Sequence, residues 1–327
     1  MRNAFINELV TCAKNDDRIF LVVADLGYSV IEPFVDAFPD RFMNIGVAEQ
    51  NMATVAAGMA SEGFKVFAYS IANFPTFRCA EQIRNDIAYH DLDVTMVSVG
   101  GGLSYGNLGY SHHAVQDYGL MRLMPNLTIA APGDPGEVRS CVQHILKASG
   151  PHYLRLAKAG EPIIRKQAIE LRPGTPYAVS PVHTTLNTDT AILTTGSVLS
   201  AVSGWLNEMG SNVPVFTMPL WGIGHKETAA EFLRNFKKII TVEDHVFDCG
   251  FGSWLQEVKY GCGLDDLEIG SVALSSEVCG RVGTQQHLYS VGGLTKQALA
   301  RAMERHNIEV PVCNASTTAL NINAGRA

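Results

Sequence analysis

The sequence has little charge and no cysteine pattern that would hold a metal. Charged residues make up 17% of its 327 residues, whereas an average globular chain has about one quarter. Acidic residues outnumber basic ones by 32 to 25, and the net charge is −7. This balance excludes a generally basic nucleic-acid-binding protein. The seven cysteines are scattered without a C-x-x-C pair, which argues against a disulfide framework and a structural zinc site.

Long apolar runs are also missing. The sequence contains no window of about 18 uninterrupted apolar residues, the length that a membrane span requires. The first stretch, MRNAFINELVTCAKNDD, is polar and lacks the apolar centre of a signal peptide. We therefore expect a soluble protein of the cytoplasm that has no membrane partner and keeps its thiols reduced.

The glycine-rich stretch from Gly100 to Gly106 lacks the spacing of a nucleotide-binding loop. A dinucleotide fingerprint needs glycine where Tyr105 stands, and a P-loop needs Gly-Lys-Ser/Thr where Asn107 and Leu108 follow. We interpret the stretch as a loop whose backbone comes close to a ligand or to a neighbouring segment.

Short β-branched runs alternate with helical stretches along most of the chain. The strands we expect are near-continuous apolar runs, typical of parallel strands buried on both faces, at residues 19–25, 94–100, 127–132, 190–196 and 238–244. The helices we expect lie near residues 3–14, 48–62, 78–90, 135–149, 197–209 and 295–307. This alternation predicts an α/β fold with mainly parallel sheets flanked by helices.

The length and the position of the prolines predict two domains. The chain is about twice as long as a typical domain, and its helical pattern breaks between Gly160 and Asp189, where four prolines fall. We expect a first domain at residues 1–160, a linker at 161–188 and a second domain at 189–310. The polar, aperiodic residues 311–327 are expected to form a surface strap or a disordered tail.

The most informative segment is NIGVAEQNMATVAAGMASEG. Its helix is built from small residues that permit close packing, and Glu49 is the only charged residue between Arg41 and Glu62. A carboxylate in the first turn of a helix is often present only because the helix dipole favours it. In such apolar surroundings, however, we expect desolvation to raise the pKa of Glu49.

At this point the sequence resembles the transketolase family. G-V-A-E-Q-N-M at 46–52 with A-A-G-M-A at 56–60 is similar to the pyrimidine-binding domain of transketolases and deoxyxylulose-phosphate synthases. Further family-like segments follow in the same order along nearly the whole chain: V-A-D-L at 23–26, F-P-D-R-F at 38–42, R-C-A-E-Q-I-R-N-D at 78–86, G-Y-S-H-H at 109–113, M-P-N-L at 124–127, T-V-E-D-H at 241–245 and G-F-G-S at 250–253.

One part of the family's pattern is missing from the sequence. The family's diphosphate-binding domain carries G-D-G followed by Asn, and the nearest match here is Gly133-Asp134-Pro135. The resemblance therefore implies the C-terminal subunit of a split transketolase. A separate N-terminal subunit with the G-D-G…N motif would bind the diphosphate of thiamine diphosphate and its magnesium ion, so no metal ligand is expected on this chain. The family places each active site between two subunits, which implies a heterotetramer.

The resemblance also implies the cofactor-binding and catalytic residues. Glu49 would donate a hydrogen bond to the cofactor's aminopyrimidine and so activate it, which needs a carboxyl group of raised pKa. Phe74 and Phe77 would supply the aromatic platform. Asp25 and Leu26, in the V-A-D-L segment, also fall at the cofactor.

The histidines of the G-Y-S-H-H segment are matched to the donor substrate. His112 falls where the family's histidine faces the donor ketose and the two-carbon intermediate, and a neutral imidazole there can bond a hydroxyl or relay a proton. His113 replaces the family's Gln and is expected to be a second polar contact.

The residues expected at the acceptor sugar depart from the family's pattern. Arg2, Ser29 and Lys158 fall where the family holds the acceptor phosphate. Gly100, however, replaces a phosphate-facing His. Leu108 replaces an Asp that reads an acceptor hydroxyl, and such a loss changes acceptor preference. We therefore expect transfer of a two-carbon ketol unit between a ketose and an aldose, with an unusual sugar, deoxygenated or branched, among the substrates.

Two alternatives stay open from sequence. A β subunit of a 2-oxoacid dehydrogenase has a similar two-domain length, and its D-Q-I-x-N-E segment resembles A-E-Q-I-R-N-D at 80–86. Gln50 and Asn51 after the glutamate and the Met-Pro-Asn sequence at 124–126 argue against it. A non-catalytic scaffold subunit would not be expected to keep Glu49, Phe74 and His112 together.

Overall fold

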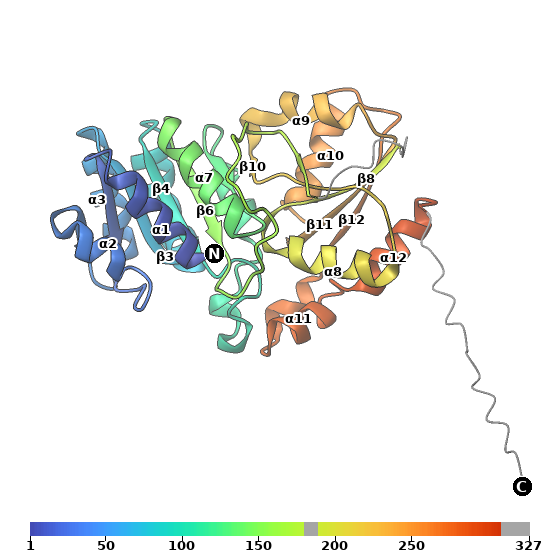
Figure 1. The fold of residues 1–327 in the computed structure, drawn as a ribbon, viewed down its shortest axis with the longest axis horizontal. Helices are drawn as coiled ribbons and strands as arrows, with labels where there is room; N and C mark the ends of the chain where they lie inside the picture. Colours follow the sequence, from blue (N-terminus) through green and yellow to red (C-terminus); the bar gives the residue numbers. More distant parts are fainter. Residues whose placement is uncertain (180–188, 309–327) are drawn as a thin grey trace, which may run out of the picture.

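The computed structural model describes residues 1–179 and 189–308, which form two β-sheets with helices packed on their faces (Figure 1). The last nine residues of the predicted linker, the last two of the predicted second domain and the predicted tail lie outside the described residues. The predicted fold class, α/β with two mainly parallel sheets, is confirmed.

The first sheet has seven strands in the order β10-β5-β6-β4-β3-β1-β2. All neighbouring pairs are parallel except β10 and β5. The strands are β1 (Ile19–Val23), β2 (Phe42–Asn44), β3 (Lys65–Ile71), β4 (Val94–Val99), β5 (Thr128–Ala130), β6 (His152–Leu156) and β10 (Leu220–Trp221). The central strands are apolar on both faces because helices cover both sides of the sheet.

Two helical layers enclose the first sheet. On one face α1 and α7 lie side by side with α2, and their apolar side chains share one core with the sheet. On the other face α3 packs its Ala and Met side chains close to the sheet. The helices of this part are α1 (Arg2–Ala13), α2 (Glu32–Ala37), α3 (Glu49–Ser61), α4 (Asn73–Phe77), α5 (Ala80–Gln82), α6 (Asp117–Met121) and α7 (Pro135–Lys147).

The helix predicted at residues 78–90 differs from the structure. The short α5 is followed there by a π-helix at Ile83–Ala88. A π-turn shifts the side chains that follow it, so an apolar 3.6-residue pattern alone does not predict it. Each strand predicted from sequence is present, as are the other predicted helices.

The second sheet has five strands in the order β12-β11-β8-β9-β7, of which only β7 is antiparallel to its neighbour. They are β7 (Tyr177–Ala178), β8 (Thr190–Thr194), β9 (Val215–Thr217), β11 (Lys238–Val246) and β12 (Glu268–Leu274). Its helices are α8 (Leu199–Met209), α9 (Lys226–Leu233), α10 (Phe251–Gly261), α11 (Gln285–Val291) and α12 (Lys296–Arg305). Among the described residues, no helix combines the length and apolar composition needed to cross a membrane.

One strand of the first sheet comes from the second half of the chain. Strand β10 follows β9 of the second sheet, yet it pairs with β5 at the edge of the first, with Leu220 opposite Ala130 and Trp221 opposite Ile129. Trp221 is fully buried there. The division predicted at residue 160 stays a prediction, but the first sheet includes residues from both sides of it.

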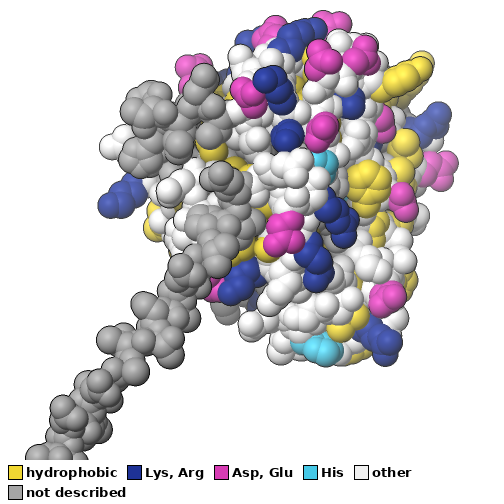
Figure 2. All heavy atoms as spheres, turned by 90° about the vertical axis from the view of Figure 1, so that its right-hand side faces the viewer, with side chains coloured by type: hydrophobic (Ala, Val, Ile, Leu, Met, Phe, Trp, Pro, Cys, Tyr) yellow, Lys and Arg dark blue, Asp and Glu magenta, His cyan; other side chains and the backbone are white. Residues whose placement is uncertain are grey.

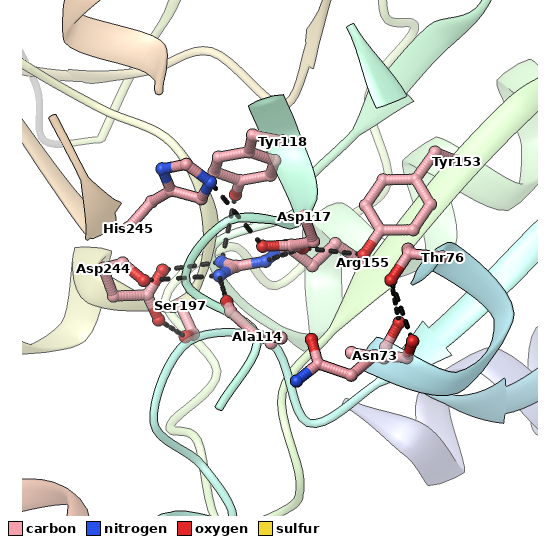
Figure 3. A network of polar contacts seen from close by, with 12 residues as sticks. Asn73, Thr76, Ala114, Asp117, Tyr118, Tyr153, Arg155, Ser197, Asp244 and His245 are labelled. Atoms are coloured by element: carbon pink, nitrogen blue, oxygen red, sulfur yellow. Dashed lines mark hydrogen bonds and ion pairs between the residues drawn. The ribbon is translucent and has the colours of Figure 1, made fainter. Parts of the chain in front are cut away.

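A buried ionic cluster joins the two parts (Figure 3). Arg155 on β6 donates from Nε to Asp117 Oδ2 at 2.7 Å and from Nη1 to Asp244 Oδ1, on β11, at 2.6 Å. Its Nη2 bonds the carbonyl of Ala114 at 2.7 Å, and its guanidinium lies 4.3 Å from the centre of the Tyr118 ring. All three charged side chains are buried. Removing one member therefore leaves a buried charge without its partner.

Further polar groups complete this cluster. Tyr153 donates to Asp117 Oδ2 at 2.6 Å and Ser197 to Asp244 Oδ2 at 3.0 Å. The Nε2 atom of His245 lies 3.9 Å from Asp117 Oδ1. Burial lowers the pKa of His245 to about 4, so its ring is neutral near pH 7. The cluster thus gives Asp244 and His245 of the T-V-E-D-H segment a structural role.

Glu243 of the same segment holds the start of a helix. Its two carboxyl oxygens accept the backbone N–H groups of Phe251 at 2.6 Å and Gly252 at 2.7 Å. These groups belong to the first turn of α10, which has no intrahelical acceptor for them. The G-F-G-S turn is therefore fitted closely around a buried carboxyl group.

Candidate active site at the edge of the first sheet

The predicted site residues follow four neighbouring parallel strands. Asp25 comes after β1, Glu49 after β2, Phe74 after β3, and the loop that contains His112 comes after β4. These strands are adjacent in the sheet in the order β4-β3-β1-β2. Because parallel strands end at the same edge, this is where open α/β sheets bind their ligands.

Glu49 is buried at the first position of α3. Arg78 donates from Nη1 to Glu49 Oε2 at 2.9 Å, while its own side chain is half exposed. The guanidinium of Arg78 also lies over the Phe74 ring, 4.2 Å from its centre. Arg78 therefore connects the predicted carboxyl group with the predicted aromatic platform.

His112 meets Phe74 edge to face, with ring centres 5.2 Å apart. Burial lowers the pKa of His112, and the nearby His113 and Arg78 lower it further, so the imidazole is neutral near pH 7. Its Nδ1 atom lies 3.0 Å from the hydroxyl of Ser111. The geometry therefore brings Glu49, Phe74 and His112 into one group.

The histidine loop is fixed to α4 by a residue that sequence reasoning missed. Asn73 donates from Nδ2 to the carbonyl of His113 at 2.8 Å and to that of Ser111 at 3.2 Å. His113 itself is buried, and its Nε2 lies 3.3 Å from the carbonyl of Gly106. A substrate contact through His113 stays a prediction, since this ring faces the loop in the structure.

The loop after β1 is organised by Asn44, which was also missed. Asn44 Oδ1 accepts the backbone N–H groups of Asp25 at 3.0 Å and Gly46 at 2.9 Å. Its amide group and the Tyr28 hydroxyl both donate to Asp25 Oδ1, and these bonds lower the pKa of Asp25. Leu26 is half-buried beside Asp25. The sequence signal that could have indicated this role is the polar Asn44 at the end of the short strand β2.

The structure places two of the three residues predicted for the acceptor phosphate side by side. Arg2 donates from Nε to the carbonyl of Lys158 at 2.5 Å. Lys158 in turn lies 5.5 Å above the centre of the Tyr105 ring, which is 6.3 Å from the ring of His112. Ser29 is exposed, and its backbone N–H donates to Glu32 at 2.7 Å. None of these contacts links Ser29 to Arg2.

The rim of this site exposes large apolar side chains. They come from all four segments that follow the strands: Tyr28, Val47, Phe77, Leu108 and Tyr110. Val47 is 75% exposed, and Phe77, a predicted part of the platform, is 51% exposed. By contrast, the face seen in Figure 2 carries intermixed acidic and basic side chains with apolar ones in small groups.

Comparison with known proteins finds relatives along most of the chain. The family described as transketolase, pyrimidine binding domain, matches residues 1–160. The chain is 30% identical over 262 residues to one of the subunits of the apulose-4-phosphate transketolase of Actinobacillus succinogenes, covering 79% of this chain and 83% of that protein. It is 31% identical over 313 residues to a transketolase C-terminal section of Methanocaldococcus jannaschii, covering 92% and 94%.

A solved structure is similar over almost its whole length. It is a split-gene transketolase described as an inactive beta4 tetramer, and it is 29% identical with a TM-score of 0.80. The match covers 93% of this chain and 97% of that one. The two-sheet architecture is therefore shared as a unit.

Proposed function

The chain belongs to the transketolase family, as the C-terminal subunit of a split transketolase, and from this we propose that it transfers a two-carbon ketol unit from a ketose to an aldose together with an N-terminal subunit. The observation that supports the proposal most directly is the grouping of Glu49, Phe74 and His112 at one sheet edge.

The residues of this group fit the aminopyrimidine end of thiamine diphosphate. When bound, this cofactor supplies the nucleophilic carbon that takes up the two-carbon unit. Arg78 bonds Oε2 of Glu49, so Oε1 is the oxygen we assign to the cofactor's ring nitrogen. Phe74 would hold the ring by stacking. A buried carboxyl group at this point is the group that the chemistry needs beside the ring nitrogen.

His112 acts on the donor ketose in this proposal. Its lowered pKa keeps the imidazole neutral near pH 7, so that it accepts a hydrogen bond or a proton from a substrate hydroxyl. Ser111 lies at Nδ1 and would fix the ring's orientation, which assigns Nε2 to the substrate.

The exposed apolar rim supports a partner that covers the site. Soluble proteins rarely expose contiguous apolar patches that are not used for binding. The five exposed side chains lie on the same four segments that carry the predicted site. We assign to the partner the G-D-G…N motif, the diphosphate and the magnesium ion, and we propose a heterotetramer. The split-gene relative is described as an inactive tetramer of beta chains, which supports the self-association of this subunit within it.

The substrates we propose are phosphorylated sugars of unusual structure. Arg2 and Lys158 lie together at the site, while Leu108 offers no hydrogen bond where an acceptor hydroxyl would otherwise be read. Equal rates with ordinary pentose phosphates and with deoxygenated or branched sugars would contradict this part of the proposal.

The experiment is to co-express the chain with a G-D-G…N protein from a neighbouring reading frame and to supply thiamine diphosphate and magnesium. Glu49→Gln should keep the assembly and reduce ketose cleavage by about 10²- to 10⁴-fold, the usual contribution of acid–base catalysis. Glu62→Gln, at the other end of α3, is the matched control and should retain full activity.

Two results would contradict the proposal. Full activity of the Glu49→Gln complex would remove the assigned role of the carboxyl group. Decarboxylation of a 2-oxoacid without any ketol transfer would instead indicate the dehydrogenase alternative.

A further inference from the structure

Position 100 has no room for a side chain because Tyr105 fills the space. A Cβ atom on Gly100 would overlap ring carbons Cδ2 and Cε2 of Tyr105, and the φ of Gly100 is +89°. Residue 105 therefore provides the aromatic group above position 100, where the family resemblance places a phosphate-facing His. The glycine and the tyrosine form one structural unit, five residues apart in the sequence.

Tyr105 lies between the two ends of the predicted substrate site. On one side its ring is 6.3 Å from His112, and on the other Lys158 lies 5.5 Å above its centre. The charge of Arg2 also acts on the Tyr105 phenol. Among the ion pairs of the described residues, none includes Arg2 or Lys158, so neither cation has a carboxylate partner there.

A pocket of about 320 Å³ lies beside Lys158 and Ser104, and its other polar side chains are Glu161, Ser197, Ser200, Gln285 and Tyr289. The Glu161 carboxylate is paired with the N-terminal ammonium group at 2.7 Å. Hydroxyl and amide groups around a lysine suit a polar, anionic ligand. The pocket is thus linked to Tyr105 through two of its lining residues: Lys158, which lies over the Tyr105 ring, and Ser104, which precedes Tyr105 in the chain.

We propose that Tyr105 is the specificity-determining residue of the acceptor site: its phenol donates a hydrogen bond to the terminal phosphate of the acceptor aldose, beside Arg2 and Lys158. This inference rests on the proposed function and adds a residue to it. Where the family's His would titrate near neutral pH, the phenol stays a neutral donor, because burial raises the pKa of Tyr105. The carbons of the Tyr105 ring, like the side chain of Leu108, offer no hydrogen bond to an acceptor hydroxyl.

The test uses the complete two-subunit complex with thiamine diphosphate and magnesium, and ribose 5-phosphate and ribose as acceptor probes. Tyr105→Phe keeps the ring above Gly100 and removes only the hydroxyl. The KM for ribose 5-phosphate should rise about tenfold, as expected for one hydrogen bond to a charged group. The KM for ribose and the rate of ketose cleavage should not change.

Tyr260→Phe is the matched control, because it removes the phenol hydroxyl of a tyrosine that is 91% exposed on α10, away from the predicted site. It should leave both KM values unchanged. If Tyr105→Phe leaves the ratio of the two KM values at its wild-type level while ketose cleavage is intact, the role of Tyr105 is refuted and the proposed function stands. If the wild-type complex cleaves no ketose, both are refuted.

A second variant tests the pairing of positions 100 and 105. Gly100→Ala should impair acceptor binding, since its methyl group displaces the Tyr105 ring. In Gly100→Ala/Tyr105→Ala the second substitution should add little to the KM for ribose 5-phosphate. Strict additivity of the two effects would overturn the pairing.

Discussion

Replacing Arg155 by Met should strongly destabilise the folded chain. The change removes the guanidinium that pairs with Asp117 and Asp244 and also loses its bond to the Ala114 carbonyl. Methionine keeps an apolar stem of similar length, so the packing of the stem changes less than the charge. Two buried carboxylates are then left without their cation.

The size of the effect follows from these contacts. Removing one partner of a buried ion pair costs about 3–5 kcal/mol. Tyr153 still donates to Asp117 and Ser197 to Asp244, so each carboxylate keeps one hydrogen bond. We therefore expect a loss of about 4 kcal/mol, which corresponds to a fall of about 10 °C in Tm for a chain of this size.

The assay is urea unfolding of the chain at pH 7, followed by circular dichroism. Arg18→Met is the control: Arg18 pairs with Asp16 at 2.8 Å on the surface, with 60% of its side chain exposed. A surface pair contributes at most about 1 kcal/mol. If the two variants lost equal stability, the argument that the buried cluster stabilises the fold more than a surface pair would be refuted.

Two further predictions concern the fitted turn around Glu243. Gly250→Ala should lower the free energy of unfolding by about 1–3 kcal/mol in urea, because the added Cβ would overlap the Glu243 carboxyl group and lie 2.6 Å from the Val246 carbonyl. Gly261→Ala is the control, since its Cβ meets nothing within 4 Å, and it should lose no stability. Equal losses in the two variants would refute the argument. Burial raises the pKa of Glu243 from 4.5 to about 8, so the folded state binds more protons than the unfolded state between these values, and stability falls as pH rises through them. Glu243→Gln lacks this proton, so its stability relative to the wild type should improve from pH 5 to pH 8, and a constant difference would contradict the assignment.

The sequence predicted the elements whose signal is local. Buried parallel strands such as 94–99 are continuous apolar runs, and such a run is visible without knowing its neighbours. Glu49 stood out for a similar reason, as a single charge in an apolar segment. The family resemblance then supplied the roles of Phe74 and His112.

What the sequence did not predict depends on residues far apart in the chain. Arg155 and Asp244 are 89 positions apart, and no local pattern says that two buried charges will meet. From sequence Tyr105 is only the residue that breaks a glycine motif, whereas in the fold its ring fills the space that a side chain at position 100 would need. Arg78 lay within a recognised segment, but its bond to Glu49 needs the fold.

The return of β10 to the first sheet has a consequence for synthesis on the ribosome. Proteins are made from the N-terminus, and domains generally fold as their residues emerge. Here β5 cannot gain its outer neighbour until Leu220 and Trp221 have been translated, and Arg155 has no Asp244 until later still. Until then, we expect the nascent first sheet to have an open edge and Arg155 to lack one of its two carboxylate partners. The folding of the first half of the chain is therefore completed by the second half.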